Sequence, residues 1–291
     1  MGSVITPMPQ RWVDAHCHYW TPETHGWLRG VQQAGPKPQP RTALTDTIFT
    51  ADFHPIAKRY LVEDAQRDLG PGPGEADDNI TSPSKSVYVQ AEWQADGGDP
   101  IEEVRWCQAL ADDPTNNGHP HAIVGFAQLD DPALAARQLA QMRLNPNFRG
   151  VRFMLDHAEG ALAPLSQTTR GDWTEDSRWR EGLALLSAPP PSTIDPGDTE
   201  SVAGWNGPLT FDLQIIAALQ GSQMARLVAD FPDITFVLNH AGFPLEDTDA
   251  HFDQWRDAMS ALAACPNCVA KFGGLGGFSE KGAWPVTSQL R

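Results

Sequence analysis

The sequence predicts a single α/β domain of the (β/α)8-barrel type, and three observations support this. Short apolar runs with β-like spacing alternate along the chain with longer amphipathic stretches, which is the pattern of parallel βαβ units. The chain has 291 residues, and one such barrel uses about 250. His16 and His18 close the first apolar run, where alternate residues of a strand project to the same side.

The order of the expected elements follows the apolar pattern. Strands are expected at residues 13–18, 86–92, 122–129, 150–155, 209–214, 234–240 and 269–275. Between them, apolar spacing of three and four predicts helices at residues 101–111, 132–143, 177–186, 222–231 and 253–263. Strands separated by helix-length segments indicate a parallel sheet.

Three segments interrupt this alternation and are expected to be loop insertions within one domain, 1–291. The stretch 21–68 is rich in Trp and Pro and is expected to cap the barrel mouth as a loop. Residues 70–85 are rich in Gly, Pro and acidic residues, which favours an exposed loop. A Pro-rich insertion is expected at 188–207. The alternation resumes after each segment, so none is interpreted as a domain boundary.

Composition excludes several classes of partner. A formal net charge of −16 and a pI near 4.8 argue against nucleic acid and anionic membranes. The sequence contains neither an apolar run of the roughly 20 residues that span a bilayer nor a signal-peptide core. Four cysteines in a chain of this length do not make a disulfide framework. The expected location is therefore cytoplasmic and the expected partner a small-molecule substrate.

Polar residues fall late in most of the expected strands, where the active site of a βα barrel lies. They are His16, His18, Glu92, Arg152, Asp212, Gln214, His240 and Lys271. Each alone has a structural alternative: Glu92 as a solvated strand end, Arg152 in an ion pair, Asp212 as a brace for a neighbouring cation. Their common position at strand ends favours function.

Two imidazoles on one side of the first strand are typical of a metal-assisted hydrolase barrel, because two histidines on the same side rarely serve packing. The Cys265–Cys268 pair has the CxxC spacing but lacks a second pair, so it is interpreted as preceding a buried strand rather than as a zinc site.

Residues 13–20 (VDAHCHYW) resemble the DxHxHxW opening of the amidohydrolase-related family (amidohydrolase 2), in its lactonase-like branch. Further motifs of that branch follow in the same order at 88–92 (YVQAE), 150–152 (GVR), 211–213 (FDL), 239–244 (NHAGFP) and 271–275 (KFGGL). The resemblance covers nearly the whole chain. It implies a distorted (β/α)8 barrel and hydrolysis of small carbonyl compounds, such as sugar-acid lactones and 2-pyrone-4,6-dicarboxylate.

The resemblance also assigns roles. His16, His18 and His240 would be catalytic and would occupy the metal or carbonyl-polarising positions, with one divalent ion such as Zn²⁺ as the expected cofactor. Arg152 would orient the substrate, and Glu92, Gln214 and Lys271 would add polar contacts. Asp212 is the nearby carboxylate to test as general base. Several relatives in this branch work without a metal, and Gln214 stands near where some of them have a histidine, which weakens the metal prediction.

The chain departs from the family pattern at its end. Relatives carry an aspartate on an eighth strand, whereas residues 278–291 contain none. The sequence thus predicts a barrel truncated before the eighth strand. A lactone hydrolase is the leading hypothesis. A metal-dependent decarboxylase on the same scaffold and a truncated, inactive homologue acting as an interaction protein remain open, and an open sheet edge would favour a homo-oligomer.

Overall fold

The computed structural model describes residues 12–35, 54–70, 82–93, 97–187, 205, 207–245 and 249–273. Within these residues one sheet of parallel strands runs in chain order from β1 to β7. The strands are β1 (Val13–Cys17), β2 (Lys85–Val89), β3 (Ala122–Gly125), β4 (Phe148–Met154), β5 (Thr210–Gln214), β6 (Phe236–Leu238) and β7 (Cys268–Ala270).

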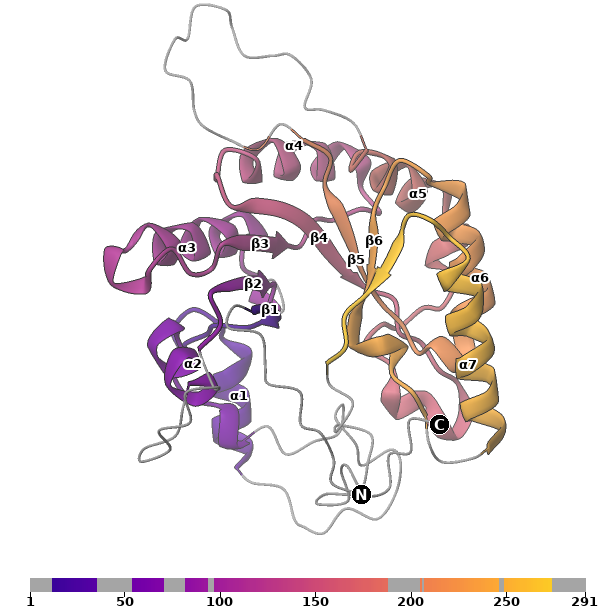
Figure 1. Ribbon diagram of the computed structural model, residues 1–291, viewed down its shortest axis with the longest axis horizontal. Coiled ribbons are helices and arrows are strands. Elements are labelled where there is room, and N and C mark those ends of the chain that lie inside the picture. The colour runs from indigo at the N-terminus through magenta and orange to yellow at the C-terminus, as the bar shows by residue number, and fades with distance from the viewer. Residues whose placement is uncertain are drawn as a thin grey trace, which may run out of the picture.

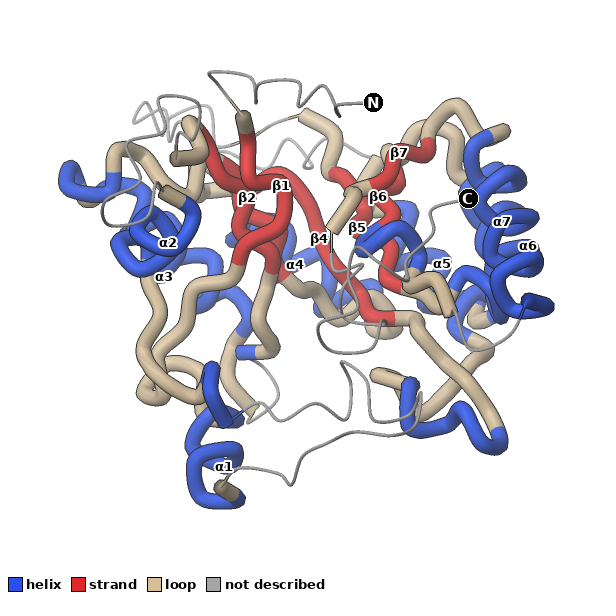
Figure 2. The backbone as a smooth tube through the Cα atoms, turned by 60° about the horizontal axis from the view of Figure 1, so that its bottom comes forward, coloured by secondary structure: helices blue, strands red, loops and turns tan. Residues whose placement is uncertain are grey.

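The sheet curls, and the helices that connect its strands lie on its outer side (Figure 1). Figure 2 shows the same arrangement after a turn of the molecule, with the strands inside and the helices around them. The helices are α1 (Trp27–Ala34), α2 (Val62–Leu69), α3 (Pro100–Asp112), α4 (Pro132–Met142), α5 (Ser177–Ala184), α6 (Ala217–Asp230) and α7 (Asp249–Ala263). This is the curled part of a (β/α)8 barrel, and the predicted fold class is confirmed.

Local sequence explains where several helices begin. Asp99, Asp131 and Asp176 precede α3, α4 and α5, and each side chain accepts hydrogen bonds from backbone amides of the first turn. Such caps satisfy donors that have no partner inside the helix. Proline at the start of α3 and α4 fits the same position, because its missing N–H is not needed there.

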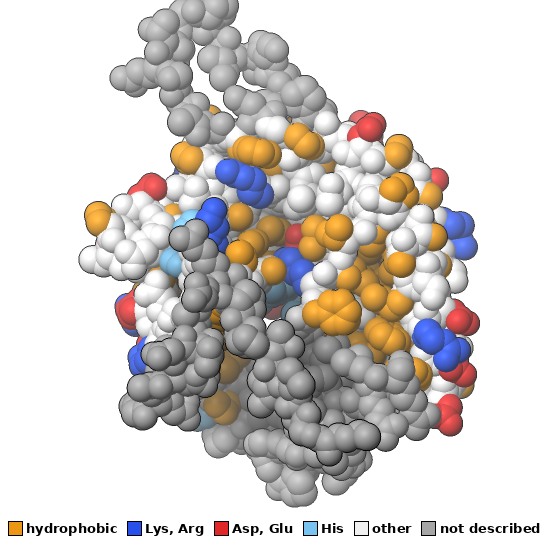
Figure 3. Space-filling model, in the orientation of Figure 1, with side chains coloured by type: hydrophobic (Ala, Val, Ile, Leu, Met, Phe, Trp, Pro, Cys, Tyr) orange, Lys and Arg blue, Asp and Glu red, His pale blue; other side chains and the backbone are white. Residues whose placement is uncertain are grey.

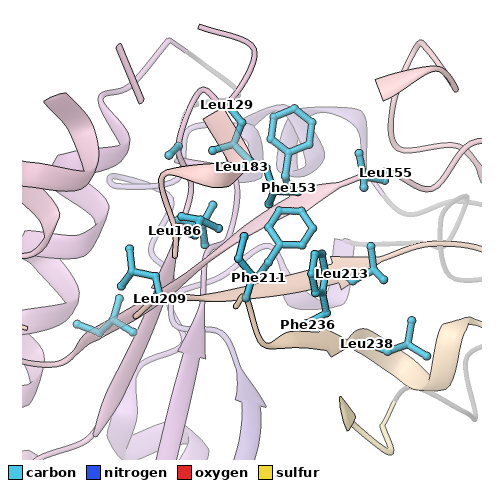
Figure 4. Close-up of a cluster of buried hydrophobic side chains, with 14 of the residues drawn as sticks. Leu129, Phe153, Leu155, Leu183, Leu186, Leu209, Phe211, Leu213, Phe236 and Leu238 are labelled. Carbon is cyan, nitrogen blue, oxygen red and sulfur yellow. The ribbon is translucent and has the colours of Figure 1, made fainter. Parts of the chain in front are cut away.

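Alternation along the strands separates a polar interior from an apolar exterior. In β4 and β5 the register pairs Arg152 with Asp212 and Phe153 with Leu213. Successive side chains point to opposite faces, so the two polar residues share the inner face. The outer face packs against the helices in a buried cluster, which Figure 4 shows. The labelled side chains are Leu129, Phe153, Leu155, Leu183, Leu186, Leu209, Phe211, Leu213, Phe236 and Leu238.

Most predicted elements are confirmed, but several differ in kind or in their bounds. The strands β2 and β7 end at Val89 and Ala270, short of the predicted residues 92 and 275, and α6 begins at Ala217 rather than at residue 222. The stretch 21–68, expected as a loop, contains α1 and α2: Asp64 accepts a hydrogen bond from Leu61 N at 3.0 Å, and Val62 and Ala65 are buried. The Trp- and Pro-rich composition around these short helices hid their periodicity. The predicted sixth strand ends at Leu238, because a turn of left-handed residues begins at His240. The predicted third strand ends at Gly125 rather than at residue 129.

Parts of the other predicted insertions, 71–81 and nearly all of 188–207, lie outside the described residues, and so does the tail 278–291. The predictions made for these segments stay predictions. None of the described helices is long and apolar enough to cross a membrane.

Gly182→Ala tests the packing of α5 on the sheet. A Cβ at Gly182 would stand 2.0 Å from the carbonyl oxygen of Leu129, so helix and loop must separate. We expect the free energy of unfolding to fall by about 1–3 kcal/mol, measured by urea denaturation. The matched control is Gly30→Ala in α1, where a Cβ meets nothing within 4 Å and stability should rise slightly. Equal stability of the two variants would contradict this packing.

Candidate active site

Three imidazoles meet at the carboxyl ends of the first and sixth strands. The ring centroids of His16 and His18 are 5.0 Å apart, and those of His16 and His240 are 4.5 Å apart. The space-filling view shows histidine, acidic and basic side chains in a hollow near the centre of the molecule, bordered by hydrophobic ones (Figure 3). The structure therefore brings His240 to two histidines that precede it by more than 200 positions in the sequence.

The end of β1 aims the two histidines. The register between β1 and β2 shifts between Asp14 and Cys17, and bulges of this kind re-aim side chains near active sites. Asp14 Oδ1 accepts a hydrogen bond from His16 N at 3.1 Å. His18 Nδ1 lies 2.7 Å from the carbonyl oxygen of Val89, so its proton is held at Nδ1 and Nε2 remains available to a ligand.

His240 sits in a strained turn after β6. Its φ is 52°, and Ala241 and Phe243 also have left-handed φ values of 49°. Such backbone costs about 1–3 kcal/mol per residue and clusters at functional sites. Hydrogen bonds from Trp255 Nε1 to the oxygen of Ala241, at 2.7 Å, and from Ala241 N to the oxygen of Lys271, at 2.9 Å, hold the turn in place.

Burial and neighbouring cations keep the three imidazoles neutral. Burial, reinforced by Arg152, lowers the pKa of His18 to about 3 and that of His240 to about 4. Burial also lowers the pKa of His16 well below its ordinary value, and the other two histidines add to the shift. Both ring nitrogens of His16 are buried, and neither has a partner among the described residues. Neutral rings with free lone pairs suit a metal ion or an acidic proton.

Arg152 places a permanent positive charge in the interior. Only 4% of the residue is exposed. Its Nη1 donates to Gln214 Oε1 at 3.1 Å, and its Nη2 donates to the carbonyl oxygen of Gln90. Its buried Nε has no partner among the described residues. A guanidinium with a free donor in this position can bind a carbonyl or carboxylate oxygen of a substrate.

Lys271 and Asp212 form a second polar unit. Lys271 Nζ lies 2.5 Å from Asp212 Oδ2, and Asn239 Nδ2 donates to the same oxygen at 3.0 Å. Asp212 is 1% exposed. The pair neutralises itself, which a buried charge requires, so this carboxylate is a brace for Lys271. Its role as general base stays a prediction.

Glu92 follows β2 in a left-handed conformation with φ of 60°. Its backbone N–H donates to the side-chain oxygen of Gln90 at 2.7 Å, which fixes this turn. Burial raises the pKa of the Glu92 carboxyl, and Arg152 opposes that shift. The carboxyl is therefore half-buried and within the electrostatic influence of the guanidinium, and its role in the site stays a prediction.

A small cavity of about 170 Å³ opens at the carboxyl ends of β2, β3 and β4. Its walls combine polar groups with an aromatic side: Gln90, Glu92, Phe126, Phe153, Met154, Gln167, Thr168 and Trp173. Arg152 joins the cavity to the histidine cluster, because it bonds the backbone of Gln90 on one side and lowers the imidazole pKa values on the other. Glu92 is thus the predicted site residue that contacts the cavity directly.

The sequence interpretation missed two residues of this site. Gln90 lies two positions before Glu92 and Asp156 lies four after Arg152, so strand alternation could have placed both on the inner face. Asp156 is fully buried and bonds Gln214.

A metal site is only partly supported. Among the described residues, no three His, Cys, Asp or Glu side chains meet in an arrangement that holds a metal ion. The imidazole donors themselves suit zinc, and His16 offers two buried nitrogens without a partner among these residues. The three-histidine metal set stays a prediction.

A curled barrel with polar residues at its strand ends is typical of barrel enzymes, and sequence comparison gives the family. The chain belongs to the amidohydrolase family, whose sequence model matches residues 13–290. It is 30% identical over 280 residues to the uncharacterized protein y4mH of Sinorhizobium fredii, covering 95% of this chain and 76% of that protein.

Solved structures share the fold. An amidohydrolase from Burkholderia multivorans with bound HEPES superposes with a TM-score of 0.60 at 21% identity, covering 93% of this chain and 72% of that one. A crystal form of the B. multivorans amidohydrolase with bound zinc gives 0.59 at 22% identity, with the same coverage. Amidohydrolase 2 from Bifidobacterium longum subsp. infantis gives 0.52 at 18% identity, covering 91% and 74%.

The low pKa of His18 makes stability depend on pH. In the unfolded chain His18 binds a proton below about pH 6.5, whereas in the folded chain it stays neutral down to about 3. Acid therefore favours the unfolded state across this window. Between pH 6.5 and 4, we expect the unfolding free energy of His18→Asn to fall less steeply with decreasing pH than that of wild type. The difference in slope should correspond to one proton fewer taken up on unfolding, measured by urea denaturation with a chelator present.

The matched control is Ser222→Asn on the exposed side of α6, which removes no titratable group and should keep the wild-type slope. Parallel curves for wild type and His18→Asn would show that His18 is not held neutral in the folded chain.

Proposed function

We propose that this amidohydrolase hydrolyses a lactone, by attack of water on the ring carbonyl. The observation that carries the proposal is the cluster of neutral imidazoles His16, His18 and His240 beside the buried guanidinium of Arg152. This combination offers lone pairs for activation and a fixed positive charge for an oxygen that becomes negative in the transition state.

Each group has a role in this scheme. Arg152 orients the substrate through its buried Nε, which has no partner among the described residues, and Lys271 adds a second positive charge near His240. As water adds to the carbonyl carbon, its proton passes to a carboxylate or an imidazole, and the ring C–O bond then breaks to give a hydroxy acid. Asp212, bonded to Lys271, is the acceptor to test.

We extend the proposal to a divalent metal, because imidazole donors suit such an ion, although the described side chains do not already stand in a metal-binding arrangement. His16, His18 and His240 would hold it, because the nitrogens of His16 are buried without a partner among the described residues and His18 keeps Nε2 free. When bound, such an ion polarises the carbonyl and lowers the pKa of a water ligand. The related barrel from B. multivorans that contains zinc supports this part of the proposal.

His18→Ala tests the function. Purified protein is assayed for acid release from a panel of sugar-acid and dicarboxylate lactones. We expect wild type to turn over at least one lactone and His18→Ala to lose about 100-fold or more in kcat/KM. His121→Ala is the matched control: it removes a histidine just before β3, at the opposite end of the strands, and should leave kcat/KM unchanged.

The same assay is repeated after the wild-type protein has been treated with a chelator. Loss of turnover that Zn²⁺ restores would support the metal, whereas unaffected turnover would assign carbonyl activation to Arg152 and Lys271. Folded wild type without activity on any lactone would contradict the proposal. It would favour a decarboxylase or an inactive interaction protein.

A further inference from the structure

A buried carboxyl that the proposed reaction does not use lies just beyond β4. Asp156 is 0% exposed, yet two donors converge on its two oxygens. Gln214 Nε2 lies 3.2 Å from Oδ1, and the backbone N–H of Gln167 donates to Oδ2 at 3.1 Å. A carboxylate can accept both bonds at once, whereas an amide or a protonated acid offers a single good acceptor.

Gln214 transmits this constraint to Arg152. A side-chain amide has one accepting end and one donating end. Because Asp156 takes the donating end, Gln214 must present Oε1 to Arg152, whose Nη1 lies 3.1 Å away. The other arm of the guanidinium bonds the carbonyl oxygen of Gln90. The plane of the guanidinium is therefore fixed from two sides, and one side depends on Asp156.

The same carboxylate also shapes the cavity. Gln167 is one of its lining residues, and its backbone N–H is held by the carboxylate and the main-chain oxygen of Asp156, each at 3.1 Å. Asp156 therefore holds both Gln214, which bonds the guanidinium, and the part of the cavity wall at Gln167.

We propose that Asp156 is a positioning residue: through Gln214 it fixes the guanidinium of Arg152, and through Gln167 it fixes the cavity wall. The effect on substrate binding rests on the proposed function, since it needs Arg152 to bind the substrate. The positioning of Arg152 does not rest on it.

The surroundings of Asp156 make this anchor sensitive to pH. Burial raises the pKa of its carboxyl to about 7, against the opposing influence of Gln214, Gln167 and the Arg152 charge. The groups contributed by β5 and by the loop at Gln167 are neutral amides, and the adjacent His157 faces Glu159 at 3.9 Å. Protonation near neutral pH would put an O–H where Gln214 or Gln167 needs an acceptor, and the amide of Gln214 would be free to turn.

The first test observes Arg152 directly. In protein labelled with 15N-arginine, the Nη signals of Arg152, assigned by their loss in Arg152→Lys, should be resolved at pH 8 and should average as the pH falls through about 7. In Asp156→Asn they should be averaged at every pH, because the amide cannot satisfy both donors. Asp113→Asn, a carboxylate that accepts two hydrogen bonds from Thr115 away from the site, should behave as wild type.

Arg152 signals that are equally resolved in wild type and Asp156→Asn would overturn the proposal. If that variant does not fold, the wild-type titration decides: signals that do not change between pH 6 and 8 would overturn it as well. Neither result depends on finding a substrate.

The second test uses any lactone that the panel shows to be turned over. Asp156→Asn should raise KM about tenfold with kcat little changed, since Arg152 would orient substrate less well. In wild type, KM should rise as the pH falls below 7, and in Asp156→Asn this rise should be absent. If Asp156→Asn lowered only kcat, or if its KM depended on pH as in wild type, the positioning role would be overturned. The hydrolase proposal would remain intact.

Discussion

The buried guanidinium of Arg152 is the constraint on which the interior of this barrel depends. An arginine keeps its charge in proteins, and an uncompensated charge at 4% exposure would be strongly destabilising. The guanidinium donates hydrogen bonds to the carbonyl oxygen of Gln90 and to the side-chain amide of Gln214. The carboxylates of Glu92 and Asp212 stabilise its charge electrostatically. Burial lowers the pKa of all three site histidines, and the same charge adds to that shift, so the guanidinium affects both the hydrogen bonding and the protonation of the site.

Backbone strain lies where the chemistry is proposed. Glu92 and His240 both take left-handed conformations at the ends of their strands, which side chains other than glycine adopt at a cost. In each case contacts from elsewhere hold the turn: Gln90 bonds the amide of Glu92, and Trp255 from α7 bonds the carbonyl of Ala241. The stability of the barrel therefore offsets the strain, and the site side chains are directed inward.

The sequence could predict features that depend on local patterns, but not those that depend on contacts between distant residues. The apolar pattern around Arg152 and Asp212 predicted their strands, and the register places the two residues opposite each other. The sequence offered Asp212 as a brace for a neighbouring cation, but only the structure selects Lys271, 59 positions away, as that cation. The short helices α1 and α2 were also missed, because each is only 8 residues long and helices of this length are formed by tertiary packing more than by their own propensity.

The sequence by itself determined the parallel α/β fold, the family and the identity of the polar residues at the strand ends, because alternation and helical spacing are local properties of the chain. Only the tertiary structure decided which of these residues meet. The imidazole of His240 reaches His16 through a left-handed turn, and Asp156 reaches Arg152 through Gln214. Charge burial and hydrogen-bond partnership depend on distances between remote segments, and these are fixed when the strands come into register.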